Sequence, residues 1–130
     1  MKKCFIIILC FVTTLSSKAQ KIDAPKKEYN IKYEVLTKKG HPVMIVFFDK
    51  EGKNSGNSVE EFWTYKFMTT DNHQNIQLFA MGGENATPRN IYGKVWTRLN
   101  IYVNDVLIKT KEGKFTGQGP TISVDLDNIK

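Results

Sequence analysis

The chain has 130 residues, of which 41% are hydrophobic and 25% are charged, so its length accommodates one domain of ordinary size. Its 19 basic and 13 acidic residues give a formal net charge of +6. Both cysteines, Cys4 and Cys10, lie close to the N-terminus. The sequence beyond Cys10 therefore excludes internal disulfides, thiolate metal sites and cysteine nucleophiles.

Residues 1–19 have the three parts of a secretory signal peptide. Two lysines precede an apolar run from Cys4 to Leu15, and the small residue Ala19 stands before Gln20. The run is shorter than the roughly 20 residues that cross a bilayer as a helix. We expect cleavage after Ala19, a periplasmic or extracellular location, and no transmembrane segment in the mature chain. An uncleaved membrane anchor is the alternative.

Cleavage would remove three lysines and no acidic residue, which lowers the formal net charge from +6 to +3. The remaining basic residues are mixed with acidic ones and form no stripe interleaved with aromatics, so we expect no nucleic-acid partner. Residues 20–28 are polar and contain Pro25, which predicts a flexible tether. Residues 29–130 then form the domain.

Apolar residues in this domain recur with the period of two that is typical of β-strands, and no long window keeps the helical period. Turn-rich segments at 49–58 and 82–90 predict long loops. Seven expected strands in about a hundred residues predict an antiparallel β-sandwich. The expected strands cover residues 29–37, 42–48, 62–68, 76–81, 94–103, 106–111 and 122–126.

The alternation also predicts which side chains face the core. The strand at 42–48 is apolar on both faces, which indicates either a strand covered on both sides or one with an exposed apolar face. The expected inward residues of the first and fourth strands are Ile31, Tyr33 and Val35, and Ile76, Leu78 and Ala80.

Asn104 and Asp105 predict a two-residue β-hairpin turn, because both residue types tolerate the positive φ of a type I′ turn. The expected register pairs Val103 with Val106, Ile101 with Ile108, and Leu99 with Thr110.

No residue pattern in the chain supports catalysis, so we expect neither an enzyme nor a cofactor. Residues 49–60 place acids at the first, third and twelfth positions of a calcium loop, but Lys53 and Asn54 occupy the fifth and sixth positions, which favours a surface hairpin over an EF-hand. The two histidines, His41 and His73, lack metal-binding spacing.

Asp125 and Asp127 would share one face of an extended strand, and a hydrolase built on this pair is a weaker hypothesis. Residues 85–87 match the N-glycosylation pattern and agree with a surface loop.

Several large apolar residues fall on the face opposite the expected core. They predict a surface that binds a partner or an apolar ligand, although aromatics shielded by loops are an alternative explanation. These candidate partner-binding residues are Phe79, Met81, Trp96, Tyr102 and Leu107.

The order of elements resembles the extracytoplasmic domain of the MmpS family, small accessory proteins of MmpL-type transporters. The similar segments are IKYEV, FWTYKF, LFAM, LNIYVNDVLI and ISVDL. The resemblance implies an immunoglobulin-like β-sandwich and a role in envelope transport. The chain departs from the family because the domain lacks its common cysteine pair and because the N-terminus is of the cleavable type.

Together these observations predict an exported, non-catalytic binding or accessory domain. Its partner is expected to be an envelope protein. The alternative hypothesis is a carrier that holds a small apolar ligand between its sheets.

Overall fold

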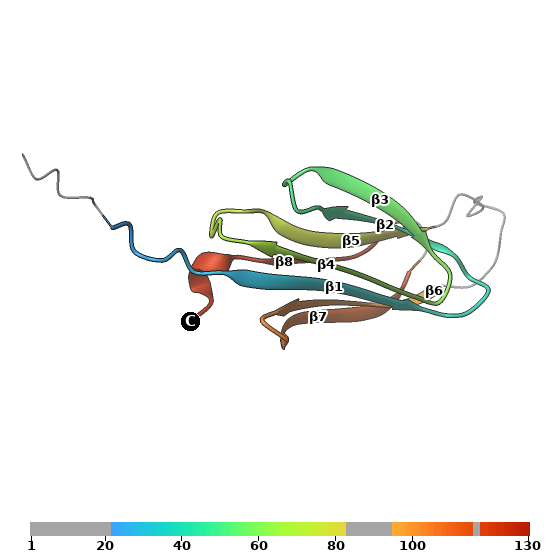
Figure 1. Ribbon diagram of the computed structural model, residues 1–130. Coiled ribbons are helices and arrows are strands. Elements are labelled where there is room, and N and C mark those ends of the chain that lie inside the picture. The colour runs from blue at the N-terminus through green and yellow to red at the C-terminus, as the bar shows by residue number, and fades with distance from the viewer. Residues whose placement is uncertain (1–21, 83–94, 116–117) are drawn as a thin grey trace, which may run out of the picture.

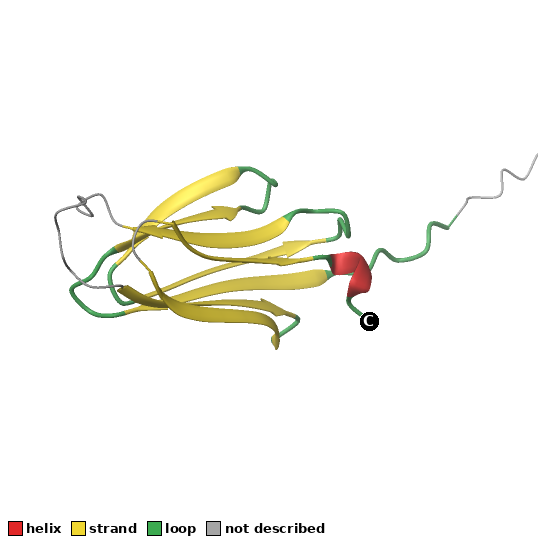
Figure 2. Cartoon of the chain, turned by 180° about the vertical axis from the view of Figure 1, so that it is seen from behind, coloured by secondary structure: helices red, strands yellow, loops and turns green. Residues whose placement is uncertain are grey.

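In the computed structural model, residues 22–82, 95–115 and 118–130 are described, and they form an all-β sandwich (Figure 1). The strands pair only with antiparallel neighbours. Figure 2 shows the one short helical turn of this region beside the C-terminus. The elements are β1 (Tyr29–Thr37), β2 (Val43–Phe48), β3 (Asn54–Val59), β4 (Phe62–Thr69), β5 (Ile76–Gly82), β6 (Val95–Val103), β7 (Val106–Phe115), β8 (Gln118–Val124) and the 3₁₀ helix η1 (Leu126–Asn128).

Two four-stranded sheets form the layers, with strand orders β4-β1-β6-β7 and β3-β2-β5-β8. The predicted β-sandwich is confirmed, but it has eight described strands instead of seven. The additional strand, β3, begins inside the segment 49–58, which was expected to be a loop, and ends one residue beyond it at Val59. Its sequence NSGNSV has low β-propensity, and only Val59 is buried. Pairing with β2 along its whole length makes it a strand nonetheless.

The core lies between the sheets and follows the alternation of the sequence. The expected inward residues of β1 and β5 are all buried, and most have no exposed surface. Val43, Ile45 and Phe47 of β2 are also buried, while the alternate residues of this strand are half-buried on the outside. Of the two possibilities for this strand, the described structure therefore supports an apolar outer face.

An aromatic cluster fills one side of this core. The ring centroid of Tyr33 in β1 lies 5.9 Å from that of Phe47 in the other sheet and 5.8 Å from that of Phe67. Phe47 in turn lies 4.8 Å from Trp63 and 5.0 Å from Tyr65. These contacts connect the two sheets through edge-on and tilted ring pairs, which add to the stabilisation from buried area.

The β6–β7 hairpin has the predicted turn but a different register. Asn104 and Asp105 have φ of 50° and 66°, and Val103 pairs with Val106 as expected. A bulge between Ile101 and Tyr102 then shifts the pairing.

The expected pairs beyond this bulge are therefore wrong: Ile101 pairs with Lys109 instead of Ile108, and Leu99 pairs with Lys111 instead of Thr110. The shift brings Thr110 opposite Asn100, to which its hydroxyl donates at 2.7 Å. Beyond the bulge, the observed register therefore places polar residues opposite each other on the outer face of the sheet.

The C-terminal segment also differs from its prediction. β8 begins at Gln118, four residues before the expected strand at 122–126, and ends at Val124 instead of continuing through Leu126. Asp125 caps η1 by accepting a hydrogen bond from the Asp127 backbone N–H at 3.0 Å. Asp125 and Asp127 therefore lie in a helical turn, not on one face of a strand.

The Tyr33 hydroxyl is a buried polar group without a hydrogen-bond partner among the described residues, although it lies near the Gln77 backbone. Burial strongly raises the pKa of this phenol. The hydroxyl therefore remains protonated and adds a desolvation cost to folding.

Replacing Tyr33 with Phe should leave the protein equally stable or make it more stable by up to about 1 kcal/mol, because the ring contacts remain and the unpaired hydroxyl is removed. Thermal and denaturant unfolding measure this difference. The matched variant Tyr102→Phe removes a hydroxyl that lies 3.2 Å from the Glu34 carboxylate, and it should cost about 1 kcal/mol. A Tyr33→Phe protein less stable than Tyr102→Phe would contradict this account.

Candidate binding faces

The five residues predicted to bind a partner all point away from the core, but the structure divides them between opposite sides of the molecule. Phe79 and Met81 lie on β5, on the outer side of the β3-β2-β5-β8 sheet. Trp96, Tyr102 and Leu107 lie on the outer side of the other sheet, where Tyr102 pairs with Leu107. The five residues therefore do not form one continuous surface.

The outer side of the β4-β1-β6-β7 sheet is called the charged face here. Its outward residues include two ion pairs, one between β6 and β7 and one within β1. Arg98 forms an ion pair with Glu112 at 2.6 Å, and Lys32 lies 3.8 Å from the Glu34 carboxylate. Such partly exposed pairs contribute little stability, but they make this face strongly polar.

The two aromatic residues on the charged face already have cationic neighbours. The Lys32 amine lies 3.7 Å from the ring centroid of Tyr102, and the Arg98 guanidinium lies 5.3 Å from that of Trp96. Partial burial and the nearby Glu34 carboxylate raise the pKa of Tyr102. Both rings are thus part of local networks on the sheet surface.

Leu107 lies beside the turn of the β6–β7 hairpin, directly opposite Tyr102. It is 46% exposed, and Val106 beside the turn is 60% exposed. Val106 and Leu107 point to opposite sides of the sheet, and single exposed aliphatic residues of this kind are common on proteins.

The outer side of the β3-β2-β5-β8 sheet carries no charged side chain among its described outward positions, and it is called the uncharged face here. Cross-strand pairs join Met44 to Met81 and Val46 to Phe79 at its centre. Met81 is 39% exposed and the others are half-buried. The remaining outward positions are Phe48, Asn54, Gly56, Ser58, Gln77, Gln118, Thr121 and Ser123.

This composition is unusual for a protein in which a quarter of the residues are charged. The centre of the uncharged face is apolar, and its rim consists of hydroxyl, amide and glycine residues together with Phe48. Apolar centres with a polar rim are typical of protein interfaces, whose centres are depleted in charge. The sequence analysis identified Phe79 and Met81 but not Met44 and Val46. The feature that could have identified these two residues is that the strand at 42–48 is apolar on both of its faces.

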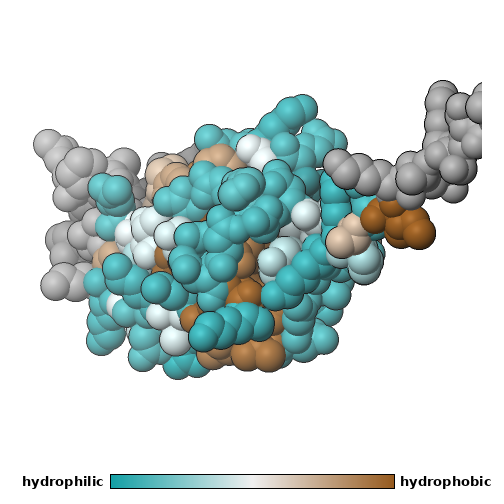
Figure 3. All heavy atoms as spheres, turned by 90° about the vertical axis from the view of Figure 1, so that its left-hand side faces the viewer, coloured by the Kyte–Doolittle hydropathy of each residue, from teal (hydrophilic) through white to brown (hydrophobic). Residues whose placement is uncertain are grey.

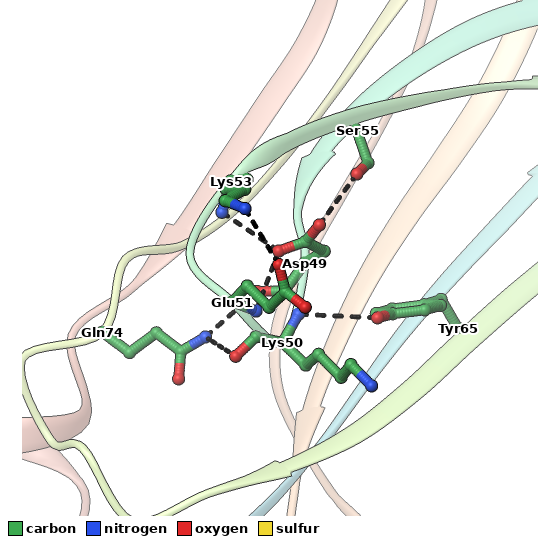
Figure 4. Close-up of polar contacts among 7 residues, drawn as sticks. All are labelled: Asp49, Lys50, Glu51, Lys53, Ser55, Tyr65 and Gln74. Atoms are coloured by element: carbon green, nitrogen blue, oxygen red, sulfur yellow. Dashed lines mark hydrogen bonds and ion pairs between the residues drawn. The ribbon is translucent and has the colours of Figure 1, made fainter.

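Residues 49–60, which resembled a calcium loop, form the turn of the β2–β3 hairpin and β3 itself, in agreement with the hairpin interpretation (Figure 4). Asp49 accepts hydrogen bonds from the backbone N–H groups of Glu51 at 2.8 Å and Lys53 at 3.0 Å, and from the Ser55 hydroxyl at 3.0 Å. Gly52 has a φ of 73°, which permits the left-handed residue of a three-residue hairpin loop. The carboxylate of Asp49 therefore stabilises the turn.

The β4–β5 loop supports the same turn from outside. The Gln74 side-chain amide donates to the backbone carbonyls of Asp49 at 3.0 Å and Lys50 at 3.1 Å, and Figure 4 shows it reaching across to the hairpin. The Tyr65 hydroxyl accepts a long contact of 3.5 Å from the Lys50 N–H. The hairpin is therefore held on both sides.

The other candidate catalytic or metal-binding residues have separate local contacts. The Asp127 carboxylate contacts the Asn72 side chain and lies 3.2 Å from His73 Nδ1, whereas Asp125 caps η1 and accepts from the Asn128 amide at 2.8 Å. Within the described residues, no group of three or more His, Cys, Asp or Glu side chains is arranged to hold a metal ion. The glycosylation pattern at 85–87 and the expected signal peptide lie outside the described residues.

The space between the sheets is filled by side chains with no exposed surface, including those of Ile45, Leu78 and Leu99. A recess of about 450 Å³ lies outside this core, where the tether meets the β4–β5 loop. Figure 3 views this end of the molecule, which is mostly hydrophilic with smaller hydrophobic areas. The recess is lined by Lys26, Lys27, Tyr29, Thr70, Asp71 and Asn72, so its position does not match that of a ligand held between the sheets.

No known protein family and no curated protein matched this chain in the comparisons. Among the described residues, no helix has the length and hydrophobicity needed to cross a membrane.

The hydrogen bonds to Asp49 lower the pKa of its carboxyl group, with the Lys53 N–H making the largest contribution. A carboxyl group with a lowered pKa in the folded state stabilises the protein above its unfolded pKa, and this stabilisation is lost as the pH falls through the folded value. Asp49→Asn should therefore lower the unfolding temperature at neutral pH, and the difference from the original protein should shrink below about pH 4.

Thermal unfolding measured across this pH range tests the expectation. The matched variant Asp105→Asn changes a carboxylate in the other hairpin turn, and among the described residues this side chain has no hydrogen-bonded partner. Its effect should be small at every pH. If the decrease in unfolding temperature caused by Asp49→Asn were the same at neutral and at acidic pH, the charge of the carboxylate would not be the stabilising feature.

Proposed function

We propose that this protein is an exported, non-catalytic binding domain that recognises a partner through the uncharged face. The observation that carries the proposal is the absence of charge from the described outward positions of a four-stranded sheet, together with its apolar centre of Met44, Val46, Phe79 and Met81. A partner that covers this face would not have to desolvate an ion, which is a major cost of burying a surface.

The uncharged face fits a partner surface better than the charged face does. The charged face presents Lys32, Glu34, Arg98 and Glu112, which already engage one another. Covering that face would bury these ions, and their mutual attraction does not generally repay the desolvation cost. By contrast, the side chains of the uncharged face gain from burial at roughly 25 cal/mol per Å² of apolar area.

The predicted export signal and the resemblance to MmpS-like domains favour a location in the cell envelope. We infer an envelope protein as the partner, with a transporter of the MmpL type as the specific candidate that the resemblance adds. The resemblance also supports an immunoglobulin-like classification of the sandwich. The carrier alternative is not supported by the filled core, so we favour recognition on a surface.

The proposal is tested with one charge placed on each face. Met81→Lys places an ammonium group at the exposed edge of the apolar centre, and Leu107→Lys makes the same change at a comparably exposed site in the other sheet, since these side chains are 39% and 46% exposed. The partner is first captured from an envelope extract and identified. Its affinity for each variant is then measured by titration calorimetry, with thermal unfolding to verify the fold.

Met81→Lys should weaken binding by roughly tenfold or more, because the charge must be desolvated at the centre of the interface. Leu107→Lys should bind as the original protein does. Loss of binding in Leu107→Lys, or in Trp96→Ala and Tyr102→Ala, with Met81→Lys unaffected, would assign recognition to the opposite face and refute the proposal.

A further inference from the structure

The four edge strands of the sandwich differ in how they are protected against pairing with another strand. Edge strands of soluble proteins are usually protected by lysines, prolines or bulges. β7 has three exposed lysines at positions 109, 111 and 114 as well as a bulge in its pairing with β6, and β8 contains Pro120. β4 has Lys66 near its middle.

β3 has none of these features. Its residues Asn54–Val59 include no charged residue and no proline, and its register with β2 continues without a bulge. Uncharged, regular edge strands are the type that accept an additional strand. β3 is therefore the described edge best suited to intermolecular pairing.

The hydrogen-bonding direction of β3 follows from its hairpin. The Asp49 N–H donates to the Lys53 carbonyl, so alternate residues from that pair onward bond to β2. Asn54, Gly56 and Ser58 then direct their backbone N–H and carbonyl groups to the open side. The Ser58 N–H is bonded to Asn57 Oδ1 at 2.9 Å, a local contact that a carbonyl of another strand could replace.

The same side of the sandwich has partly exposed aromatic residues. β3 lies against β1 of the other sheet, so β4, the neighbour of β1, is the outermost strand of the other layer on this side. Trp63, Tyr65 and Phe67 of β4 point inward but are only partly buried. The facing positions of β3, Ser55 and Asn57, are too small to cover them.

We propose that β3 pairs antiparallel with β3 of a second copy, with Gly56 opposite the partner's Gly56. This register is self-complementary, because Asn54 of each copy lies opposite the partner's Ser58, and every outward N–H meets a carbonyl. Two-fold pairing of this kind makes the same contacts twice. It also brings the two rows of β4 aromatics together in the other layer and reduces their exposure.

The size of this contact determines its strength. A six-residue strand is about 20 Å long and the sheets lie about 10 Å apart, so the flank covers roughly a few hundred Å² per copy. Stable dimers bury about 800 Å² per copy. The association is therefore reversible and depends on concentration, and it is independent of the partner that the uncharged face binds.

Three substitutions at Gly56 provide the test. Gly56→Pro removes an N–H from the open edge without removing a bond to β2, and edge strands tolerate proline at such positions. Gly56→Lys keeps the N–H but places two like charges directly opposite each other. Gly56→Ala is the matched control, because a Cβ there would lie 3.5 Å from the Ile45 carbonyl, an ordinary contact.

Sedimentation velocity of the purified protein over a wide concentration range should show a monomer–dimer equilibrium, retained in Gly56→Ala. The dissociation constant should rise at least about tenfold in Gly56→Lys and in Gly56→Pro. Circular dichroism verifies the fold, and Gly56→Lys serves if the proline variant does not fold. A monomer at every concentration, or dimers unaffected by both variants, would overturn the proposal.

Fluorescence gives a second readout of the same association. In a Trp96→Phe background Trp63 is the remaining tryptophan of the chain, and its emission should shift to shorter wavelength as the dimer forms. The shift should be absent in Gly56→Lys. A dimer that forms without a change in Trp63 emission would show that the β3 flank is not the contact.

Discussion

The packing of β1, an inner strand of the β4-β1-β6-β7 sheet, against the opposite sheet is the constraint on which the rest of the sandwich depends. β1 pairs with β4 on one side and β6 on the other, and its inward side chains Ile31, Tyr33 and Val35 are almost completely buried. Tyr33 connects the layers through Phe47. Side chains alternate along each strand and paired residues point to the same side of a sheet. Once the inward residues of β1 are fixed, the outward residues of the strands paired in that sheet are therefore fixed as well.

Alternation in the sequence was sufficient to predict most of the fold, because the strands with one buried face have a strong apolar period. β3 was missed for the corresponding reason: it buries only Val59, and its Asn, Ser and Gly residues are typical of loops. The hairpin register was wrong beyond Ile101 because a bulge depends on cross-strand partners such as Asn100 and Thr110, which a single strand does not reveal.

The candidate surface shows a different limit of sequence reasoning. Alternation distinguishes inward from outward residues, but it does not say to which of two sheets an outward residue belongs. Phe79 and Trp96 therefore were grouped together although β5 and β6 lie in different sheets. The strand at 42–48, which is apolar on both faces, contains the other half of the surface, since Met44 and Val46 lie beside Met81 and Phe79. Only the order of strands in the sheet shows that these four residues are neighbours.

The lysines of β7 have a consequence for how far assembly can proceed. A sandwich with open edges on both flanks adds copies indefinitely and forms fibres, whereas one protected flank stops growth. Figure 1 shows β3 and β7 on opposite sides of the molecule. Because Lys109, Lys111 and Lys114 line the β7 side, the proposed pairing through β3 would end at two copies and form a closed assembly.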